Sequence, residues 1–146
     1  MCQCKHRCFE KMELVTSAAQ VNLQDNTRIR QNKVTSIMVQ SPDPAQSQTY
    51  LSPMGRNLAN WTTLNSSYLY IVTQNGTTLA PIPLSMIVRN YNSPEPLRVD
   101  WELVDPTQSY IQINTGASGY SATAAFVLVF GIDCDACGIS PNENRL

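Results

Sequence analysis

The sequence predicts an all-β fold built from two antiparallel sheets. Only 14% of the 146 residues are charged, and 9 prolines accompany many Ser, Thr, Asn and Gln residues, a mixture that suits short strands and turns better than long helices. Several short segments alternate apolar and polar side chains and are separated by turn-forming residues. Roughly seven or eight strands at this spacing, with one long polar loop, favour a jelly-roll-like β-sandwich. An immunoglobulin-like sandwich is the alternative, but the paired core cysteines around a Trp are missing.

In the first half of the chain, strands are expected over residues 12–17, 19–23 and 28–40. The third is the longest, and Val34, Ser36 and Met38 lie on one of its faces. The polar segment 41–67 that follows is a loop interrupted by three prolines and Gly55, with a short strand near Tyr50 and one helical turn at residues 58–64.

In the second half, strands are expected over residues 68–73, 77–79, 97–104, 109–114 and 122–132. Asn75 and Gly76 separate the first two and predict a type I′ hairpin turn, because both central positions of that turn need positive φ. Residues 84–90 fit either a strand or one turn of helix.

Two of these strands predict parts of the core. The alternation over 97–104 places Val99, Trp101 and Leu103 on its buried side, and Tyr110 is assigned to the core as well. Residues 122–132 are apolar on both faces, so this strand is expected to lie centrally in its sheet or at a subunit interface.

The chain is expected to form one domain with two distinctive ends. Residues 1–11 are a Cys-rich N-terminal arm, 12–133 the β-sandwich, and 134–146 a Cys-containing tail. The net charge of −1 argues against a general nucleic-acid-binding protein. The start of the chain is nevertheless basic and its end acidic, so the two ends can attract each other within a subunit or between neighbours. The first residues lack the apolar stretch of a standard secretory signal.

The cysteines predict a structural metal site. Five are present, all near the ends of the chain: Cys2, Cys4, Cys8, Cys134 and Cys137. The last two have the C-x2-C spacing that lets two thiolates reach one zinc ion, and the N-terminal group can supply the other ligands, with His6 as a spare. Three alternatives stay open: disulfides, reduced thiols, which the missing secretory signal favours, and acylation of the N-terminal group beside Lys5 and Arg7.

No catalytic centre is predicted. The single histidine lies in the N-terminal arm, away from any rigid support. Asp100 and Glu102 form the best carboxylate pair, but they share the polar side of their strand, where solvated carboxylates are expected. No glycine-rich phosphate loop occurs. Binding is the more plausible activity, and the aromatic residues of the long loop, Trp61 and Tyr50, are the candidates to touch a partner.

The middle of the chain resembles small jelly-roll virion proteins of tailless icosahedral phages, which serve as vertex (penton) or minor capsid subunits. The resemblance rests on residues 51–57, 68–72, 82–85, 99–101 and 109–111, with Asn75-Gly76, and covers roughly residues 50–130. It does not include the Cys-rich ends.

The resemblance implies a structural virion protein, assembled in the host cytoplasm, whose partners are copies of itself and other capsid proteins. The basic arm, with Lys5 and Arg7, could touch neighbouring subunits, a membrane or a genome. The alternative is a carbohydrate- or ligand-binding β-sandwich whose groove is built from loops such as 41–67.

Overall fold

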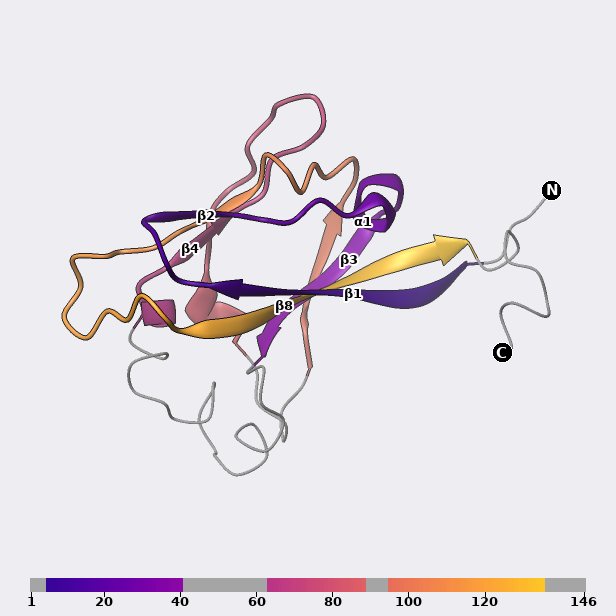
Figure 1. Ribbon diagram of the computed structural model, residues 1–146. Helices are drawn as coiled ribbons and strands as arrows, with labels where there is room; N and C mark the ends of the chain where they lie inside the picture. The colour runs from indigo at the N-terminus through magenta and orange to yellow at the C-terminus, as the bar shows by residue number, and fades with distance from the viewer. Residues whose placement is uncertain (1–4, 41–62, 89–94, 136–146) are drawn as a thin grey trace.

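The computed structural model of the chain describes residues 5–40, 63–88 and 95–135 (Figure 1). Its elements, in chain order, are β1 (Lys5–Val15), β2 (Gln20–Asn22), α1 (Thr27–Gln31), β3 (Val34–Gln40), β4 (Tyr68–Tyr70), β5 (Ile82–Pro83), the 3-10 turn η2 (Leu84–Met86), β6 (Leu97–Trp101), β7 (Tyr110–Gln112) and β8 (Ala125–Asp135). The predicted all-β class and the two antiparallel sheets are confirmed.

The strands form two four-stranded sheets, in the orders β1-β8-β3-β6 and β2-β7-β4-β5. Four antiparallel pairings follow a nested order along the chain. The first strand pairs with the last, β1 with β8, and the pairs β2 with β7, β3 with β6 and β4 with β5 lie successively inside it. Two further pairings, β3 with β8 and β4 with β7, join these pairs into sheets. The chain is therefore paired as one long hairpin whose successive strand pairs alternate between the two sheets.

The core lies between the sheets and takes alternate residues from both. From β8 it receives Phe126, Leu128, Phe130 and Ile132, all fully buried. Ile37 and Val39 of β3 join them, and Leu69 and Ile111 come from the opposite sheet. The predicted central position of the last strand is confirmed, because β8 pairs with β1 along its whole length and with β3 on its other side.

Residues 28–31, expected to begin a long strand, form the short helix α1 instead. Asn26 caps this helix, because its Oδ1 accepts a hydrogen bond from the backbone N–H of Ile29 at 2.9 Å. Ile29 is completely buried and anchors the helix to the core. The strand prediction was wrong here because five residues are too few to show a helical period.

The hairpin at Asn75 and Gly76 forms, but with a different turn. Gly76 has a φ of 88°, whereas Asn75 does not have a positive φ, so the turn is not type I′. The N–H of Gly76 donates to the carbonyl of Thr73 at 2.9 Å, and Thr73 N–H donates to Thr77. This is the three-residue loop in which a left-handed glycine follows the turn. The side chain of Asn75 stabilises it by accepting from the N–H of Thr77.

Two predicted core residues lie elsewhere. Leu103 is 58% exposed and has a φ of 56°, so the alternation of β6 ends before it, and Val104 is buried instead. Tyr110 is only half-buried and stacks on Tyr70, on the opposite side of the sheet from the buried Leu69 and Ile111. Trp101, by contrast, packs against the core as expected.

The ends of the described chain lie side by side because β1 and β8 pair (Figure 1). Residues 5–11 of the expected arm belong to β1, and Cys134 of the expected tail belongs to β8. The described helices are all too short or too polar to cross a membrane.

Candidate interaction surfaces

The predicted site residues are only partly within the described structure. Cys2, Cys4, Cys137, Tyr50 and Trp61 lie outside the described residues. Lys5 and Arg7 lie in β1, where they are in register with Asp135 and Asp133 of β8. Arg7 is exposed. The basic arm therefore enters the sheet at residue 5, and its proposed contact with partners stays a prediction.

The two described cysteines are joined. The pairing of β1 with β8 sets the Cα atoms of Cys8 and Cys134 5.8 Å apart, and their sulfurs form a disulfide across 126 residues of sequence. The zinc prediction required the two Cys-bearing ends to meet, and a disulfide was one of its open alternatives. A disulfide of this kind persists in oxidising conditions.

Charged residues surround this disulfide on the α1 side. Arg28 of α1 donates from Nη2 to Cys134 Sγ at 2.9 Å and forms an ion pair with Glu10 through Nη1 at 2.9 Å. The other oxygen of Glu10 accepts from Asn26 Nδ2 at 2.8 Å. Helix α1 is thereby fastened to β1 and β8 at the end of the sandwich that carries the disulfide.

The metal prediction is neither confirmed nor contradicted. Within the described residues, no group of three or more His, Cys, Asp or Glu side chains is arranged to hold a metal ion. A sulfur in a disulfide is not a thiolate and cannot bind zinc, so in this state Cys8 and Cys134 are not ligands. Structural zinc at the terminal cysteines stays a prediction.

The outer face of the first sheet carries an apolar strip over β1, β8 and β3, which we call the Phe9 face. Its members are Phe9, Val15, Met38, Val127 and Val129. These residues lie on neighbouring strands at paired positions that follow one another along the sheet. In one set of paired positions Val129 lies between Lys11 and Met38, and in the next set Val127 lies between Glu13 and Gln40. Phe9 is 48% exposed, whereas Val129 is 2% exposed although it lies outside the core cluster. Arg7, Lys11 and Glu13 border the strip along β1.

The outer face of the second sheet carries tyrosines and amides, and we call it the tyrosine face. One register row holds Gln20, Gln112 and Tyr68, and the next holds Asn22, Tyr110 and Tyr70. Tyr70 and Tyr110 stack with their ring centroids 5.0 Å apart and an interplanar angle of 15°. Tyr68 is 43% exposed.

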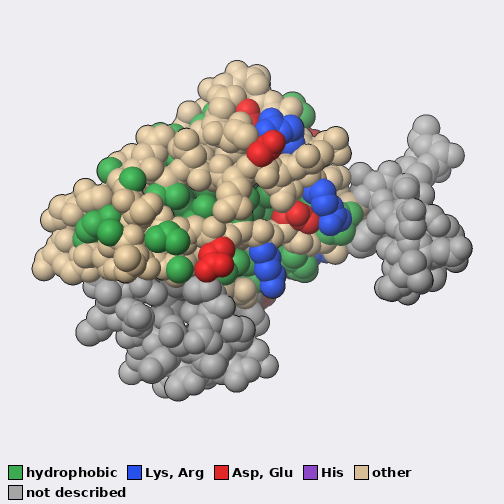
Figure 2. Space-filling model, viewed as in Figure 1, with side chains coloured by type: hydrophobic (Ala, Val, Ile, Leu, Met, Phe, Trp, Pro, Cys, Tyr) green, Lys and Arg blue, Asp and Glu red, His purple; other side chains and the backbone are tan. Residues whose placement is uncertain are grey.

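Charge is distributed unevenly between the two sheets. Segments 14–24, 63–88 and 106–132 contain every strand of the second sheet, together with most of β8 from the first sheet, and they have no Lys, Arg, Asp or Glu. Figure 2 shows the charged side chains gathered towards α1 and β1, whereas the end of the molecule that carries the β7–β8 connection has none on the face in view. The tyrosine face is therefore neutral as well as aromatic.

A buried carboxylate joins α1 to the loop between β6 and β7. Asp105 is 6% exposed. Its oxygens accept hydrogen bonds from Thr107 Oγ1 at 2.7 Å and Gln108 Nε2 at 2.6 Å, and Oδ1 forms an ion pair with Arg30 at 3.1 Å. These donors, the Thr107 hydroxyl foremost, hold the pKa of Asp105 below its ordinary value although burial opposes them. Asp105 is thus a structural anion.

The expected attraction between the basic start and the acidic end operates within one subunit. Arg30 pairs with Asp105, and Lys33 pairs with Asp100 at 2.8 Å. The side chain of Asp100 is 74% exposed and Glu102 is exposed too, so this carboxylate pair lies on the solvated surface as predicted.

The tyrosine face was not predicted from the sequence. Its signal was present in the alternation of Tyr68, Leu69 and Tyr70 and of Tyr110, Ile111 and Gln112. Alternation alone does not say which side faces the core, and Tyr110 was given to the wrong side. No family model, curated protein or solved structure matches this chain.

Proposed function

We propose that this protein is a structural subunit that works by self-assembly, as the subunits of virus capsids do. The strand pairing carries the proposal. The pairs β1·β8, β2·β7, β3·β6 and β4·β5 alternate between the sheets. A long hairpin rolled around its core produces this arrangement, so we assign the sandwich to the eight-stranded jelly-roll type.

The step from this fold to a capsid role is made by analogy, since one fold serves many functions. Jelly rolls include both capsid and lectin domains. The resemblance of residues 50–130 to small virion proteins favours the capsid role. We propose that the chain also contacts other capsid proteins.

The surface that we assign to self-assembly is the Phe9 face, and its occupant is a second copy of the chain. The strip is apolar at its centre, and along β1 it is bordered by Arg7, Lys11 and Glu13. Because both signs of charge occur on one border, a two-fold arrangement can set basic residues of one copy against acidic residues of the other. Phe9, nearly half exposed, is the apolar side chain of the strip that we expect to contribute most to the contact.

The test is native mass spectrometry and negative-stain microscopy of the purified chain over a range of concentrations. We expect a closed oligomer or a larger shell-like particle. Phe9→Asp should abolish it, because a carboxylate buried in an apolar contact is unpaired and strongly unfavourable.

The matched control is Leu103→Asp, which places the same charge at an exposed leucine outside the Phe9 face. This variant should assemble as the unmodified chain does, and circular dichroism should show that both variants are folded. A monomer at every concentration would contradict self-assembly. An oligomer that both variants form equally would contradict the assignment to the Phe9 face.

A further inference from the structure

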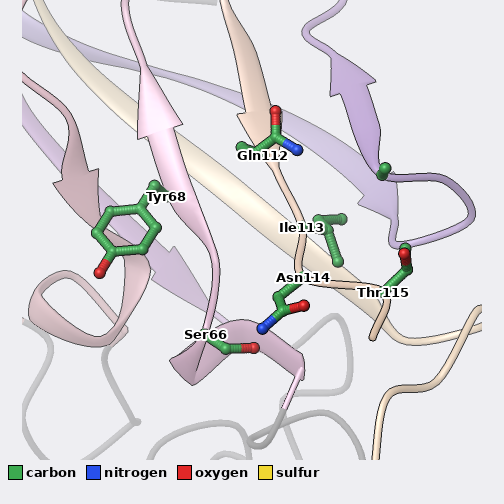
Figure 3. A pocket seen from close by; sticks show the side chains of 7 residues that line it. Ser66, Tyr68, Gln112, Ile113, Asn114 and Thr115 are labelled. Atoms are coloured by element: carbon green, nitrogen blue, oxygen red, sulfur yellow. The ribbon is translucent and has the colours of Figure 1, made fainter. Parts of the chain in front are cut away.

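A pocket of about 440 Å³ opens beside the tyrosine face, at the end of the sheet where β7 ends and β4 begins (Figure 3). Its polar lining comes from Ser66, Tyr68, Gln112, Asn114 and Thr115. In Figure 3, Asn114 and Ser66 extend toward each other, with the ring of Tyr68 on one side of them and Thr115 on the other. The volume is in the range of small-molecule sites.

The lining combines an aromatic surface with groups that both donate and accept hydrogen bonds. The amide oxygen of Asn114 accepts from the N–H of Gly116 at 3.2 Å, so its position is fixed and its Nδ2 remains a donor. Among the described residues, neither Gln112 nor Tyr68 makes a side-chain hydrogen bond. Hydroxyl and amide groups of this kind match a ligand rich in hydroxyl groups.

Among the described residues, the lining of the pocket is uncharged. All its lining residues lie in segments 14–24, 63–88 and 106–132, which contain no ionisable Asp, Glu, Lys or Arg. A charged ligand would lose its hydration here without gaining an ion pair, which is unfavourable. A neutral ligand is therefore favoured over a phosphate, a uronate or an acidic peptide.

The tyrosine face extends the pocket along the sheet. Tyr68 and Gln112 share one register row, and the stacked rings of Tyr70 and Tyr110 lie in the next. Gln20 Nε2 donates to Asn22 Oδ1 at 3.0 Å, which orders the amides at the β2 side of the same face. A ligand with several rings can therefore continue from the pocket over these aromatic residues.

We propose that this pocket and the adjoining tyrosine face bind a neutral oligosaccharide. A sugar ring has an apolar C–H face, which packs on the exposed ring of Tyr68, while the amides of Gln112 and Asn114 bind its hydroxyl groups. The site lies on the second sheet, so it does not depend on self-assembly through the Phe9 face. It also differs from the loop that the sequence analysis assigned to carbohydrate binding.

The test uses ¹H–¹⁵N correlation spectra of the chain titrated with neutral oligosaccharides of glucose, galactose, mannose and N-acetylglucosamine. We expect at least one of them to shift the amide signals of residues 66–70 and 110–115 saturably. Tyr68→Ala should weaken that binding by about tenfold or more, which corresponds to about 1.4 kcal/mol. Raising the salt concentration should change it little.

The control is Leu103→Ala, which removes an exposed apolar side chain outside both the pocket and the Phe9 face and should leave the affinity unchanged. No saturable shift with any of the neutral sugars would overturn the proposal. So would binding that Tyr68→Ala leaves intact, or binding only of anionic sugars with strong salt dependence. Gln112→Ala, on the exposed side of β7, gives a second variant if Tyr68→Ala fails to fold.

Discussion

The hydroxyl of Ser36 occupies the space that a side chain at Gly131 would need. The two residues are register partners in β3 and β8. A Cβ atom at position 131 would collide with Ser36 Oγ, and it would meet Ser36 Cβ at 3.3 Å and Phe9 Cε1 at 3.5 Å. Ser36 Oγ is itself buried and is without a hydrogen-bond partner among the described residues. The end of the Phe9 face that carries Phe9 is therefore closely packed around a glycine.

This packing predicts opposite effects for two alanine substitutions. Ser36→Ala should raise the free energy of unfolding by up to about 1 kcal/mol, because it removes a buried hydroxyl that has lost its water without gaining a partner. Gly131→Ala should lower it by about 1–3 kcal/mol, because the added methyl group forces neighbouring atoms apart. Urea unfolding of the single variants measures both effects.

The double variant tests whether the two effects share a cause. In the Ser36→Ala background, Gly131→Ala should cost less by at least about 0.5 kcal/mol, since the closest clashing atom is gone. Strictly additive changes would show that the Ser36 hydroxyl is not what excludes a side chain at position 131.

The buried carboxylate of Asp105 predicts a stability that depends on pH. Its pKa is lower in the folded protein than in the unfolded chain, so its contribution is fully present above the unfolded value of about 4 and is lost as the pH falls through the folded value. Asp105→Asn should cost roughly 1–3 kcal/mol at neutral pH, because Arg30 loses an ion pair and two donors lose an anionic acceptor.

The gap in stability between the unmodified chain and Asp105→Asn should therefore narrow as the pH falls from about 6 to about 3. Urea unfolding at several pH values measures it. Asp100→Asn is the control, because that carboxylate is exposed and its pair with Lys33 should contribute little. A gap that does not change with pH would contradict the role given to the Asp105 charge.

Leu103 predicts a stabilising substitution. It is a bulky, exposed residue with a φ of 56°, and its carbonyl accepts from Gln74 N–H at 2.6 Å. L-residues other than Gly, Asn and Asp lose about 1–2 kcal/mol in the left-handed region. Leu103→Asn should raise the melting temperature by a few degrees, as scanning calorimetry would measure.

Leu103→Val is the matched control at the same position. A β-branched side chain is the least compatible with positive φ, so this variant should melt below the unmodified chain. If asparagine were no better than valine, the conformation of residue 103 would not be a source of strain.

Prediction from the sequence succeeded where the residues of a single strand were enough to show its position in the sheet. The apolar run of β8 has no polar face, so its central position followed directly. Where the outcome depended on tertiary contacts, prediction failed. Residues 28–31 became helical because Ile29 is buried and Asn26 caps the turn, and neither contact is visible in a five-residue pattern. Tyr110 was misplaced because the direction of an alternating strand is set by the sheet that packs on it.

The bond between Cys8 and Cys134 predicts a stability that depends on redox conditions. It closes a loop of 126 residues, and in the chain-entropy model a loop of this length lowers the entropy of the unfolded state by an amount worth about 4–5 kcal/mol. Reduction with dithiothreitol, or the double variant Cys8→Ser with Cys134→Ser, should therefore lower the melting temperature markedly. Peptide mapping without reductant should recover the peptides that contain residues 8 and 134 as one linked species.

The same samples separate this bond from the predicted zinc site. A chelator should leave the melting temperature of the oxidised chain unchanged, whereas the reductant should lower it. A chain that loses stability to the chelator but not to the reductant, and that contains about one zinc per molecule by elemental analysis, would instead hold its ends together through thiolates. That result would replace the Cys8–Cys134 bond with the metal site that the C-x2-C spacing predicts.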